Sequence, residues 1–289
     1  MNYILHNNEV EVTCVRDFDL VKTFECGQCF RWEADEKGKY TGITRGHVAS
    51  LRSEGDSVFI SCAIDDFKGV WCDYFDLDKD YPEIRRRLSS DGFMREASDF
   101  GSGIRILRQD GWEALCSFII SQCNNIPRIK KIIAALCREF GESSDFMGRK
   151  YFAFPSADKL AALEECDLAP LRCGYRAAYI IGAARAVASG ALDLSALAQT
   201  DPGCARAALK SLHGVGDKVA DCVVLYGLHM LDAFPLDVWM KRAVAEHYGP
   251  GFDPSIFSPY AGIAQQYIYY YARNAKNENS NRLTTSTSR

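Results

Sequence analysis

Two hydrophobic patterns follow one another along the chain. Up to about residue 65, short runs of β-branched and aromatic residues alternate with turn clusters, and residues 39–64 (KYTGITRGHVASLRSEGDSVFISCAI) read as three strands joined at TRGH and SEGD. Beyond that point, apolar residues recur at helical spacing. The predicted fold class is therefore α+β: a small N-terminal antiparallel sheet domain in residues 1–98, then a larger α-helical domain in residues 99–275.

Several segments of the later region have the apolar spacing of helices, and some end at a glycine, as helices commonly do. They are 112–125, 127–141, 156–166, 175–190, 204–214, 237–249 and 258–273. The polar stretch 276–289 has too few apolar residues to pack, so we expect a disordered tail there.

Composition narrows the class of protein. The chain has 289 residues, 47% of them hydrophobic, which is enough for a sizeable core. No apolar run reaches about 18 residues and no signal peptide opens the chain, so we expect no membrane partner and no secretion. Twelve dispersed cysteines indicate reduced thiols. We expect a cytoplasmic, nucleoid-associated protein if the source is bacterial and a nuclear one if it is eukaryotic.

Charge is unevenly distributed between the two regions. Residues 1–100 carry 13 basic and 20 acidic side chains, whereas residues 101–289 carry 21 and 18. A polyanionic partner would therefore meet the later region. The overall net charge of −4 fits a protein that uses few phosphate contacts and specific geometry, although many solvated surfaces have the same balance.

The stretch SLHGVGDKVADC contains a candidate phosphate site. A helix, the turn Gly214–Val215–Gly216 and a second helix form a helix-hairpin-helix. The three turn amides and the positive end of the second helix can bind one or two backbone phosphates without reading sequence. An ordinary corner between two helices is the structural alternative.

A lysine in the first turn of the second helix adds chemistry to this site. Lys218 lies where the helix dipole disfavours a cation, and that field favours the neutral amine, which is a nucleophile. Cys222 shares its helix face at i+4. Asp237, in FPLDV, is placed to cap the next helix and to hold a carboxylate near the amine. Lysine, carboxylate and phosphate-binding turn together suit attack on a sugar carbon of DNA.

These segments resemble a known family. LHGVGDKVADC with FPLDV is similar to the helix-hairpin-helix, Gly/Pro-rich, aspartate motif of base-excision DNA glycosylases, and the lysine is typical of its bifunctional lyase branch. FECGQCFRW (24–32), ILRQDGWEALCSFIISQCNNIPRI (106–129), GYRAAY (174–179) and YAGIAQQYIYYYAR (260–273) resemble 8-oxoguanine DNA glycosylases. The matching segments occur in the family's order over most of the chain.

The resemblance implies a mechanism with named residues. The damaged nucleotide is flipped out of the duplex, Lys218 attacks the deoxyribose C1′ to form a Schiff base, and β-elimination cleaves the strand. Asp237 stabilises the positive charge on the sugar. The Gly27 carbonyl accepts a hydrogen bond from N7–H of 8-oxoguanine, where guanine presents only an acceptor; a simple turn glycine is the alternative.

The resemblance also implies three contacts to the flipped base. Cys222 and Tyr269 sandwich it, and Gln265 bonds its Watson–Crick edge. Tyr269 stands where the family usually has phenylalanine, and YIYYYAR is equally typical of an amphipathic core helix.

Four more residues are implied on the partner strand. Arg128 and Arg176 match positions that would read an orphaned cytosine, since arginine has only donors and cytosine offers adjacent acceptors. The alternative is that both bind phosphates or helix C-termini. Tyr175 matches a wedge that supports the bend. The asparagine that fills the gap left by the flipped base aligns with Cys123, beside Asn124, and either residue could fill it.

The implied function is that of a monomeric glycosylase/lyase that acts on double-stranded DNA containing 8-oxoguanine opposite cytosine, with no cofactor and no metal site. Trp239 stands where the family often has a histidine. Cys26 and Cys29 form a single C-x-x-C, and two cysteines are too few ligands to indicate a metal site. A monovalent cation on the hairpin carbonyls stays open. Two alternatives remain: an alkylated-base glycosylase, which would need no lysine, and a non-catalytic module that only docks on DNA.

Overall fold

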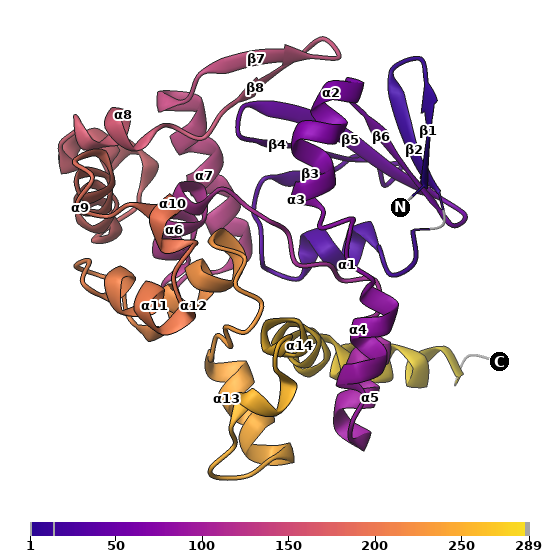
Figure 1. Cartoon of the computed structure of the whole chain (residues 1–289). Coiled ribbons are helices and arrows are strands. Elements are labelled where there is room, and N and C mark those ends of the chain that lie inside the picture. The colour runs from indigo at the N-terminus through magenta and orange to yellow at the C-terminus, as the bar shows by residue number, and fades with distance from the viewer. Residues whose placement is uncertain (1, 14, 287–289) are drawn as a thin grey trace.

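The computed structural model describes residues 2–13 and 15–286. Its N-terminal part is a six-stranded antiparallel sheet, and the rest is mostly helical, which confirms the predicted α+β class (Figure 1). The spatial order of the strands is β1-β2-β6-β5-β4-β3. Their bounds are β1 Asn2–His6, β2 Glu9–Thr13, β3 Trp32–Ala34, β4 Tyr40–Thr44, β5 His47–Glu54 and β6 Ser57–Ser61.

The three strands predicted from residues 39–64 are confirmed as β4, β5 and β6. Their turns are tight, because Thr44 pairs with His47 and Glu54 pairs with Ser57. The first turn carries Gly46 at φ 82°, a left-handed backbone that suits glycine. Two-residue turns of this kind fix the register of the meander.

The helical part contains every segment in which we predicted a helix. The helices are α1 Leu20–Glu25, α2 Ile64–Asp66, α3 Cys72–Tyr74, α4 Tyr81–Leu88, α5 Gly92–Phe100, α6 Gly111–Ser121, α7 Ile126–Phe140, α8 Ala157–Ala161, α9 Arg176–Ala188, α10 Leu194–Leu197, α11 Pro202–Lys210, α12 Asp217–Cys222, α13 Val238–His247 and α14 Ala261–Ser286. Two π-helical segments are η1 Phe67–Trp71 and η3 Val223–Gly227, and two 3₁₀ segments are η2 Glu165–Leu171 and η4 Pro254–Phe257. A small hairpin, β7 Ser143–Phe146 and β8 Arg149–Phe152, was not predicted.

Two predicted boundaries differ from the structure. The helix expected over 156–166 ends at Ala161 and gives way to the 3₁₀ turn η2, which contains Pro170. At the other end, α14 runs to Ser286, into the stretch expected to be a disordered tail, because no glycine or proline interrupts it. Residues 287–289 lie outside the described residues.

Each region has its own core. In the sheet region, Phe24 of α1 stacks on Trp32 with ring centroids 4.4 Å apart, and Trp71 and Phe75 pack beside them. The helical core includes buried residues of α4 to α9 and of α11 to α14, and partly buried residues of α10 pack against it. Helix α4 therefore packs with the helical core although it precedes the boundary at 98/99, and that boundary stays a prediction.

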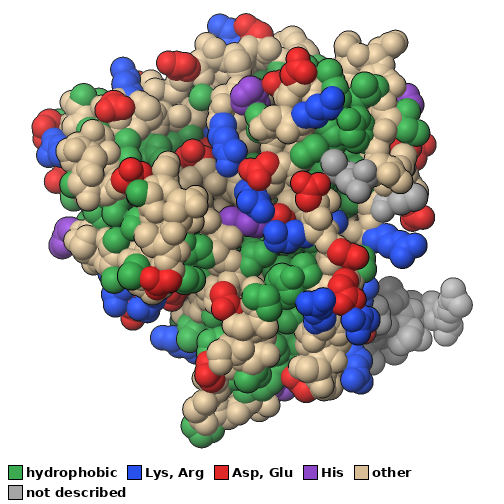
Figure 2. All heavy atoms as spheres, in the orientation of Figure 1, with side chains coloured by type: hydrophobic (Ala, Val, Ile, Leu, Met, Phe, Trp, Pro, Cys, Tyr) green, Lys and Arg blue, Asp and Glu red, His purple; other side chains and the backbone are tan. Residues whose placement is uncertain are grey.

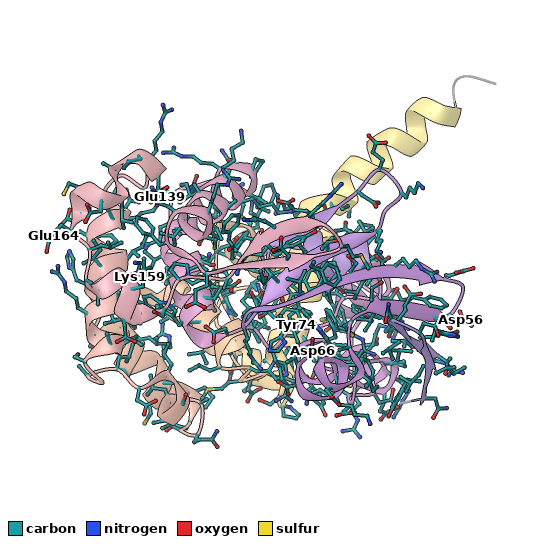
Figure 3. All side chains as sticks on the ribbon, turned by 90° about the horizontal axis from the view of Figure 1, so that it is seen from above. Asp56, Asp66, Tyr74, Glu139, Lys159 and Glu164 are labelled. Atoms are coloured by element: carbon teal, nitrogen blue, oxygen red, sulfur yellow. The ribbon has the colours of Figure 1, made fainter. Side chains whose placement is uncertain are left out.

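The molecule is elongated from its helical end to its sheet end. Seen from above, the last turns of α14 project away from the body (Figure 3). Glu139, Lys159 and Glu164 lie on the helical side and Asp56 at the far edge of the sheet side, with Asp66 and Tyr74 nearer the middle (Figure 3).

The segment that follows α1 is joined to both cores. Cys26 and Phe30 belong to the helical core, whereas Cys29 belongs to the sheet core. Between them, the fully buried Gln28 side chain donates to the carbonyl of Arg105 at 2.7 Å and accepts from the amide of Leu107 at 2.9 Å. The loop that carries Gly27 is therefore held rigidly at the junction of the two regions.

A buried ion pair fixes the same junction one turn further on. Arg31 donates to Glu113 of α6 at 3.1 Å and to the carbonyl of Phe152 in β8. Burial raises the pKa of the Glu113 carboxyl, and the guanidinium of Arg31 opposes that rise. The pair ties the sheet region to the start of α6, the helix whose last residue, Ser121, contacts Lys218.

Candidate active site

The hairpin is built as the sequence predicts, with α11 and α12 on either side of a glycine turn. Gly214 has φ 84°, and a Cβ atom on it would overlap the ring of Tyr179 in α9. Only glycine satisfies both the backbone conformation and the close approach of the ring. The turn is therefore seated on α9 as well as on its own two helices.

The three backbone amides of the turn differ in whether they are free to bind a phosphate. The Val215 amide donates to the carbonyl of Leu212 at 3.1 Å, so it does not face outward as we expected. Gly216 caps α12 with no side-chain bond, and within the described chain the amides of Gly214 and Gly216 have no acceptor. The amides that remain as candidate donors to a phosphate are therefore those of Gly214 and Gly216, together with the open N-terminus of α12.

The side chain of Lys218 points from α12 toward α6. Its Nζ donates to the Ser121 hydroxyl at 3.3 Å and lies 5.1 Å from the ring centroid of Phe118. No carboxylate of the described residues forms an ion pair with this amine. A partly buried amine against a hydroxyl and an aromatic face keeps its lone pair accessible once it is neutral.

Two acidic neighbours on the same helix are occupied elsewhere. Asp217 pairs with Lys210 at 2.6 Å and with Arg206 at 2.8 Å, and Asp221 pairs with Arg206 at 2.6 Å. Both cations come from α11. Helix α11 thus engages both carboxylates, and neither forms an ion pair with the amine of Lys218.

Asp237 caps the next helix in chain order. Its Oδ1 accepts from the amide of Met240 at 2.9 Å at the N-terminus of α13, as the sequence predicts for a cap. The side chain is only partly buried, so one carboxylate oxygen stays open. A carboxylate oriented by a helix end has a fixed position beside the site.

Tyr226 lies in the turn η3 that follows α12, next to residues predicted to contact the base. Burial raises the pKa of Tyr226 well above its usual value, and Cys222, Cys26, Tyr269 and Asp237 add to that rise. Two of these four groups, Cys222 and Tyr269, are among the predicted base contacts.

The thiol of Cys222 is a packing surface and not a nucleophile. It is 4% exposed, and burial raises its pKa to about 11, which the amine of Lys218 partly opposes. The thiol therefore stays neutral near neutral pH. A neutral, polarisable sulfur offers a flat contact for a base.

Gln265 is held by the same phenol. The Tyr226 hydroxyl donates to Oε1 of Gln265 at 3.4 Å and to Oε1 of Gln266. Gln266 in turn donates to the carbonyl of Cys26 at 3.3 Å. Within the described residues the Nε2 of Gln265 has no partner, so this amide can still bind the edge of a base.

Gly27 lies against α14 with a free carbonyl. It has φ 89°, and a Cβ on it would lie 3.8 Å from the Tyr269 hydroxyl and 3.7 Å from Ile126. The neighbouring carbonyls of Cys26 and Gln28 accept hydrogen bonds, whereas no donor of the described chain reaches that of Gly27. Tyr269 itself accepts from Arg273 at 3.1 Å.

The residues predicted to contact the DNA strand opposite the lesion lie on the turn after α6, in the first turn of α7 and at the start of α9. Cys123 is exposed at φ 46°, whereas the Asn124 amide donates to the carbonyl of Ile120 at 3.1 Å and accepts from the amide of Asn125. Cys123, and not Asn124, therefore projects from this turn. Tyr175 is 52% exposed, and its hydroxyl lies beside the Cys123 thiol.

The two arginines predicted on the partner strand differ. Arg128 is exposed and makes one side-chain bond, to the carbonyl of Arg172 at 3.3 Å. Arg176 is 5% exposed and donates to backbone carbonyls with all three guanidinium nitrogens. The alternative of a helix C-terminus therefore fits Arg176, and only Arg128 remains accessible to a base.

Sequence reasoning missed the residues that position these groups. Ser121 meets Lys218 across 97 positions, Gln122 donates to the Gly214 carbonyl at 3.0 Å across 92, and Tyr226 organises two glutamines. The spacing between distant positions gives no signal for such contacts. The polar end of the otherwise apolar helix at residues 121–122 was the one available hint.

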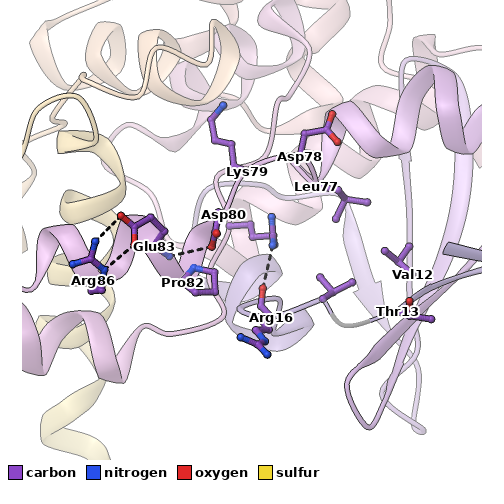
Figure 4. Close-up of a pocket in the computed structure, with 12 residues that line it drawn as sticks. Val12, Thr13, Arg16, Leu77, Asp78, Lys79, Asp80, Pro82, Glu83 and Arg86 are labelled. Carbon is purple, nitrogen blue, oxygen red and sulfur yellow. Dashed lines mark hydrogen bonds and ion pairs between the residues drawn. The ribbon is translucent and has the colours of Figure 1, made fainter. Parts of the chain in front are cut away.

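Neither charge nor cavity size marks the site. On the face in Figure 2, positive and negative side chains are interspersed without a broad area of one sign. A cavity of about 510 Å³ lies between the end of β2 and the start of α4, lined by Thr13, Arg16, Asp80 and Arg86 (Figure 4), and one of about 650 Å³ lies between the start of α6 and α10; neither contains a predicted residue. In the described part of the chain, no group of three or more His, Cys, Asp or Glu side chains could hold a metal ion, and no helix has the length and apolarity to cross a bilayer.

Known proteins match both regions of the chain. Two family models match, "8-oxoguanine DNA glycosylase, N-terminal domain" at residues 12–115 and "HhH-GPD superfamily base excision DNA repair protein" at residues 116–255. The N-glycosylase/DNA lyase of Saccharomyces cerevisiae is 34% identical over 257 residues, which cover 79% of this chain and 68% of that protein. The chain belongs to the N-glycosylase/DNA lyase family.

Solved structures of family members have the same fold over nearly the whole chain. MBOgg1, solved with a low-affinity DNA ligand, is 43% identical with a TM-score of 0.91, covering 95% of this chain and 99% of its own. The 8-oxoguanine glycosylase/lyase of Clostridium acetobutylicum, solved with DNA containing cytosine opposite 8-oxoguanine, is 38% identical with a TM-score of 0.90, covering 96% and 99%. The family resemblance inferred from the motifs is thereby confirmed.

Proposed function

We propose that this protein excises 8-oxoguanine from double-stranded DNA, preferentially opposite cytosine, and then cleaves the abasic strand. The observation that carries the proposal is the amine of Lys218, which lies beside the open end of α12, next to Cys222 and without a carboxylate partner in the described chain. A monofunctional enzyme that activates water has no use for a lysine in this position.

The chemistry follows from the amine. The lone pair of neutral Lys218 forms a bond to the deoxyribose C1′, the bond from C1′ to N9 breaks, and the base leaves with that electron pair and then takes up a proton. The aminal opens to a Schiff base, and loss of the acidic proton at C2′ expels the 3′ phosphate by β-elimination. Asp237 stabilises the positive charge that develops on the sugar, and its cap on α13 holds it in place.

Recognition rests on a different group. The unpartnered Gly27 carbonyl accepts from N7–H of 8-oxoguanine, whereas guanine would place an acceptor against it. One such hydrogen bond discriminates by about 1–3 kcal/mol. Because guanine is in vast excess, the cost of flipping and the alignment of Lys218 must contribute the rest. Cys222 and Tyr269 contact the faces of the base, and the free amide of Gln265 binds its edge.

The DNA strand is held at few points. The amides of Gly214 and Gly216 bind a phosphate, Cys123 fills the gap left by the base, Tyr175 supports the bend, and Arg128 bonds the orphaned cytosine. We keep as predictions that the protein acts as a monomer and works on DNA in the cytoplasm of a bacterium or the nucleus of a eukaryote.

An excision panel tests the proposal. Duplexes with 8-oxoguanine, alkylated purines or oxidised pyrimidines, each opposite the four bases, are incubated with the protein under single-turnover conditions, with borohydride trapping in parallel. We expect release of 8-oxoguanine, at least about tenfold faster opposite cytosine than opposite adenine, and a trapped covalent adduct. Release of alkylated purines without trapping would support the alkylated-base alternative, and binding without release would support a docking module.

A further inference from the structure

The proposed base pocket has a cation beside it that the recognition of the base leaves unused. Arg273 lies in α14 one turn after Tyr269, and its Nη1 donates to the Tyr269 hydroxyl at 3.1 Å. The same Nη1 lies 3.9 Å from the position that a Cβ on Gly27 would occupy, and Ile126 lies 3.7 Å from that position. Arg273 therefore borders the loop whose free carbonyl is the proposed reader of the lesion.

The guanidinium of Arg273 keeps both its charge and its donors available. Among the described residues it forms no ion pair, and the Tyr269 hydroxyl is its one hydrogen-bond partner. Burial raises the pKa of Tyr269, and Arg273 opposes that rise, so the phenol is neutral near neutral pH and does not cancel the charge of the arginine. Because the hydroxyl occupies one nitrogen of a group that has several N–H donors, further donors are left for a ligand.

The atoms of 8-oxoguanine decide which of them such a donor can meet. Its N7–H is flanked by O6 on one side and by O8 on the other, and both oxygens are acceptors. In the proposed pose the Gly27 carbonyl accepts from N7–H, and the amide of Gln265 binds the edge that carries O6. The acceptor that is left beside N7–H is O8, the atom that guanine lacks.

We propose that Arg273 is a specificity-determining residue that donates to O8 of the flipped base, and that the Tyr269 hydroxyl is a positioning group that holds it there. This inference deepens the proposed function and rests on it. Guanine presents a C8–H at the same place, so an N–H of the guanidinium would lose its solvent without gaining an acceptor. That penalty adds to the mismatch at Gly27, and the hydroxyl by which Tyr269 differs from phenylalanine acquires a role.

Duplexes that resist cleavage test recognition apart from chemistry. A 2′-fluoroarabino sugar, which keeps its base, carries 8-oxoguanine, 7-deaza-8-oxoguanine or guanine opposite cytosine, and a fourth duplex has a tetrahydrofuran abasic site. Arg273→Met removes the guanidinium and keeps a long side chain. It should bind both bases that carry O8 at least about tenfold more weakly, as expected for loss of one charged hydrogen bond.

A charge-matched variant separates this loss from general electrostatics. Arg138 is an exposed arginine in the last turn of α7, and in the described part of the chain it forms no ion pair. On the guanine and abasic duplexes, Arg273→Met should weaken binding no more than Arg138→Met does, because both remove one positive charge. Only the duplexes that carry O8 should distinguish the two variants.

Single-turnover excision of 8-oxoguanine opposite cytosine gives the second measurement. Arg273→Met should slow release of the base at least about tenfold. Tyr269→Phe should slow it by a smaller factor, because the ring stays and only the bond that positions the guanidinium is lost. The two effects should not add, so Tyr269→Phe should change little once Arg273 is absent. Arg273→Lys should restore part of the loss, since an ammonium has donors but not the planar fork.

Three outcomes would overturn the inference. One is an equal loss by Arg273→Met on the abasic duplex, which would make Arg273 a phosphate contact. Another is a loss that disappears with 7-deaza-8-oxoguanine, which would tie Arg273 to N7–H and not to O8. The third is wild-type binding and excision, which would leave Arg273 as packing against Tyr269. If Arg273→Met does not fold, Arg273→Lys carries the same comparisons. If wild type releases no 8-oxoguanine from any duplex, the proposed function fails, and the affinities of the uncleaved duplexes still decide the inference.

Discussion

Two helix N-termini flank the candidate site and are used in opposite ways. Helix α12 begins at Gly216 with no side chain over its amides, whereas α13 begins at Asp237, whose carboxylate accepts from the amide of Met240. Both ends carry the same partial positive charge. The first is left open for an external anion, and the second is closed by an internal one.

The difference shows how the positive end of a helix can serve two steps, binding of the DNA strand and release of the base. In the proposed mechanism, the open end of α12 binds a phosphate and so places the strand, and the closed end of α13 fixes a carboxylate where positive charge would develop. Lys218 lies in the first turn of the open helix, between these two functions. Variants at the start of α12 should therefore weaken DNA binding, and variants at the start of α13 should slow base release. Lys218 is the exception, because it lies in α12 but its loss should stop the chemistry.

The largest effect is expected from Lys218→Gln. Loss of the nucleophile should lower base release by at least about 10⁴-fold and abolish borohydride trapping, because no Schiff base can form. Affinity for damaged DNA should stay within a few-fold, since the open amides are untouched. Single-turnover excision and gel-shift titration measure the two quantities. Excision at the wild-type rate would remove Lys218 from the mechanism.

Asp237→Asn should have the next largest effect. Asparagine caps a helix as well as aspartate does, so the melting temperature should change little. Removal of the charge should slow excision by about 10²–10³-fold, the range typical for loss of one group that stabilises a transition state. Thermal denaturation is measured beside excision. A loss of activity that merely followed unfolding would make Asp237 only a cap.

Gly214→Ala tests the open end with a smaller effect. The left-handed φ of 84° and the ring of Tyr179 oppose a Cβ, so we expect about 1–3 kcal/mol of strain and roughly tenfold weaker DNA binding. Gly216→Ala is the matched control, because its φ is −93° and a Cβ there meets nothing within 4 Å. Equal weakening in both variants would show that any side chain added beside the phosphate weakens binding, and that the left-handed backbone of Gly214 is not the cause.

The smallest effect concerns the thiols and tests whether Cys222 is buried in the pocket. At pH 8 an alkylating reagent should modify the exposed Cys123, Cys166 and Cys204 and spare Cys222. With a pKa of about 11, only about one Cys222 thiol in a thousand is ionised at pH 8, and its reaction should accelerate as pH rises toward 11. Mass spectrometry of digests gives the result. Rapid labelling of Cys222 at pH 8 would contradict its place in the buried pocket.

Sequence reasoning reached the features that depend on neighbours in the chain. The strands of residues 39–64, the hairpin and the cap at Asp237 are local patterns, and each is found in the structure. The family motifs added the site residues, which remain a proposal. Nothing in the local sequence stops α14, which runs to Ser286; disorder of the stretch 276–289 stays a prediction.

What the sequence could not supply depends on contacts across long separations. The Val215 amide was expected to face a phosphate, but the turn folds it back on Leu212. Arg176 looks like a base reader in GYRAAY, and only packing against the end of α6 shows that its donors are occupied. The hairpin β7–β8 has short, half-polar strands with little alternation, so it leaves no periodic signal.

The junction around Gln28 has a consequence for building chimaeras from relatives. Cys26 and Phe30 belong to the helical core and Cys29 to the sheet core, and the Gln28 amide is bonded to residues almost 80 positions away. An exchange of the sheet region cut anywhere near residue 98 would therefore separate this loop from Arg105 and Leu107. A transplant that keeps lesion recognition has to carry 26–31 and 105–109 from the same parent.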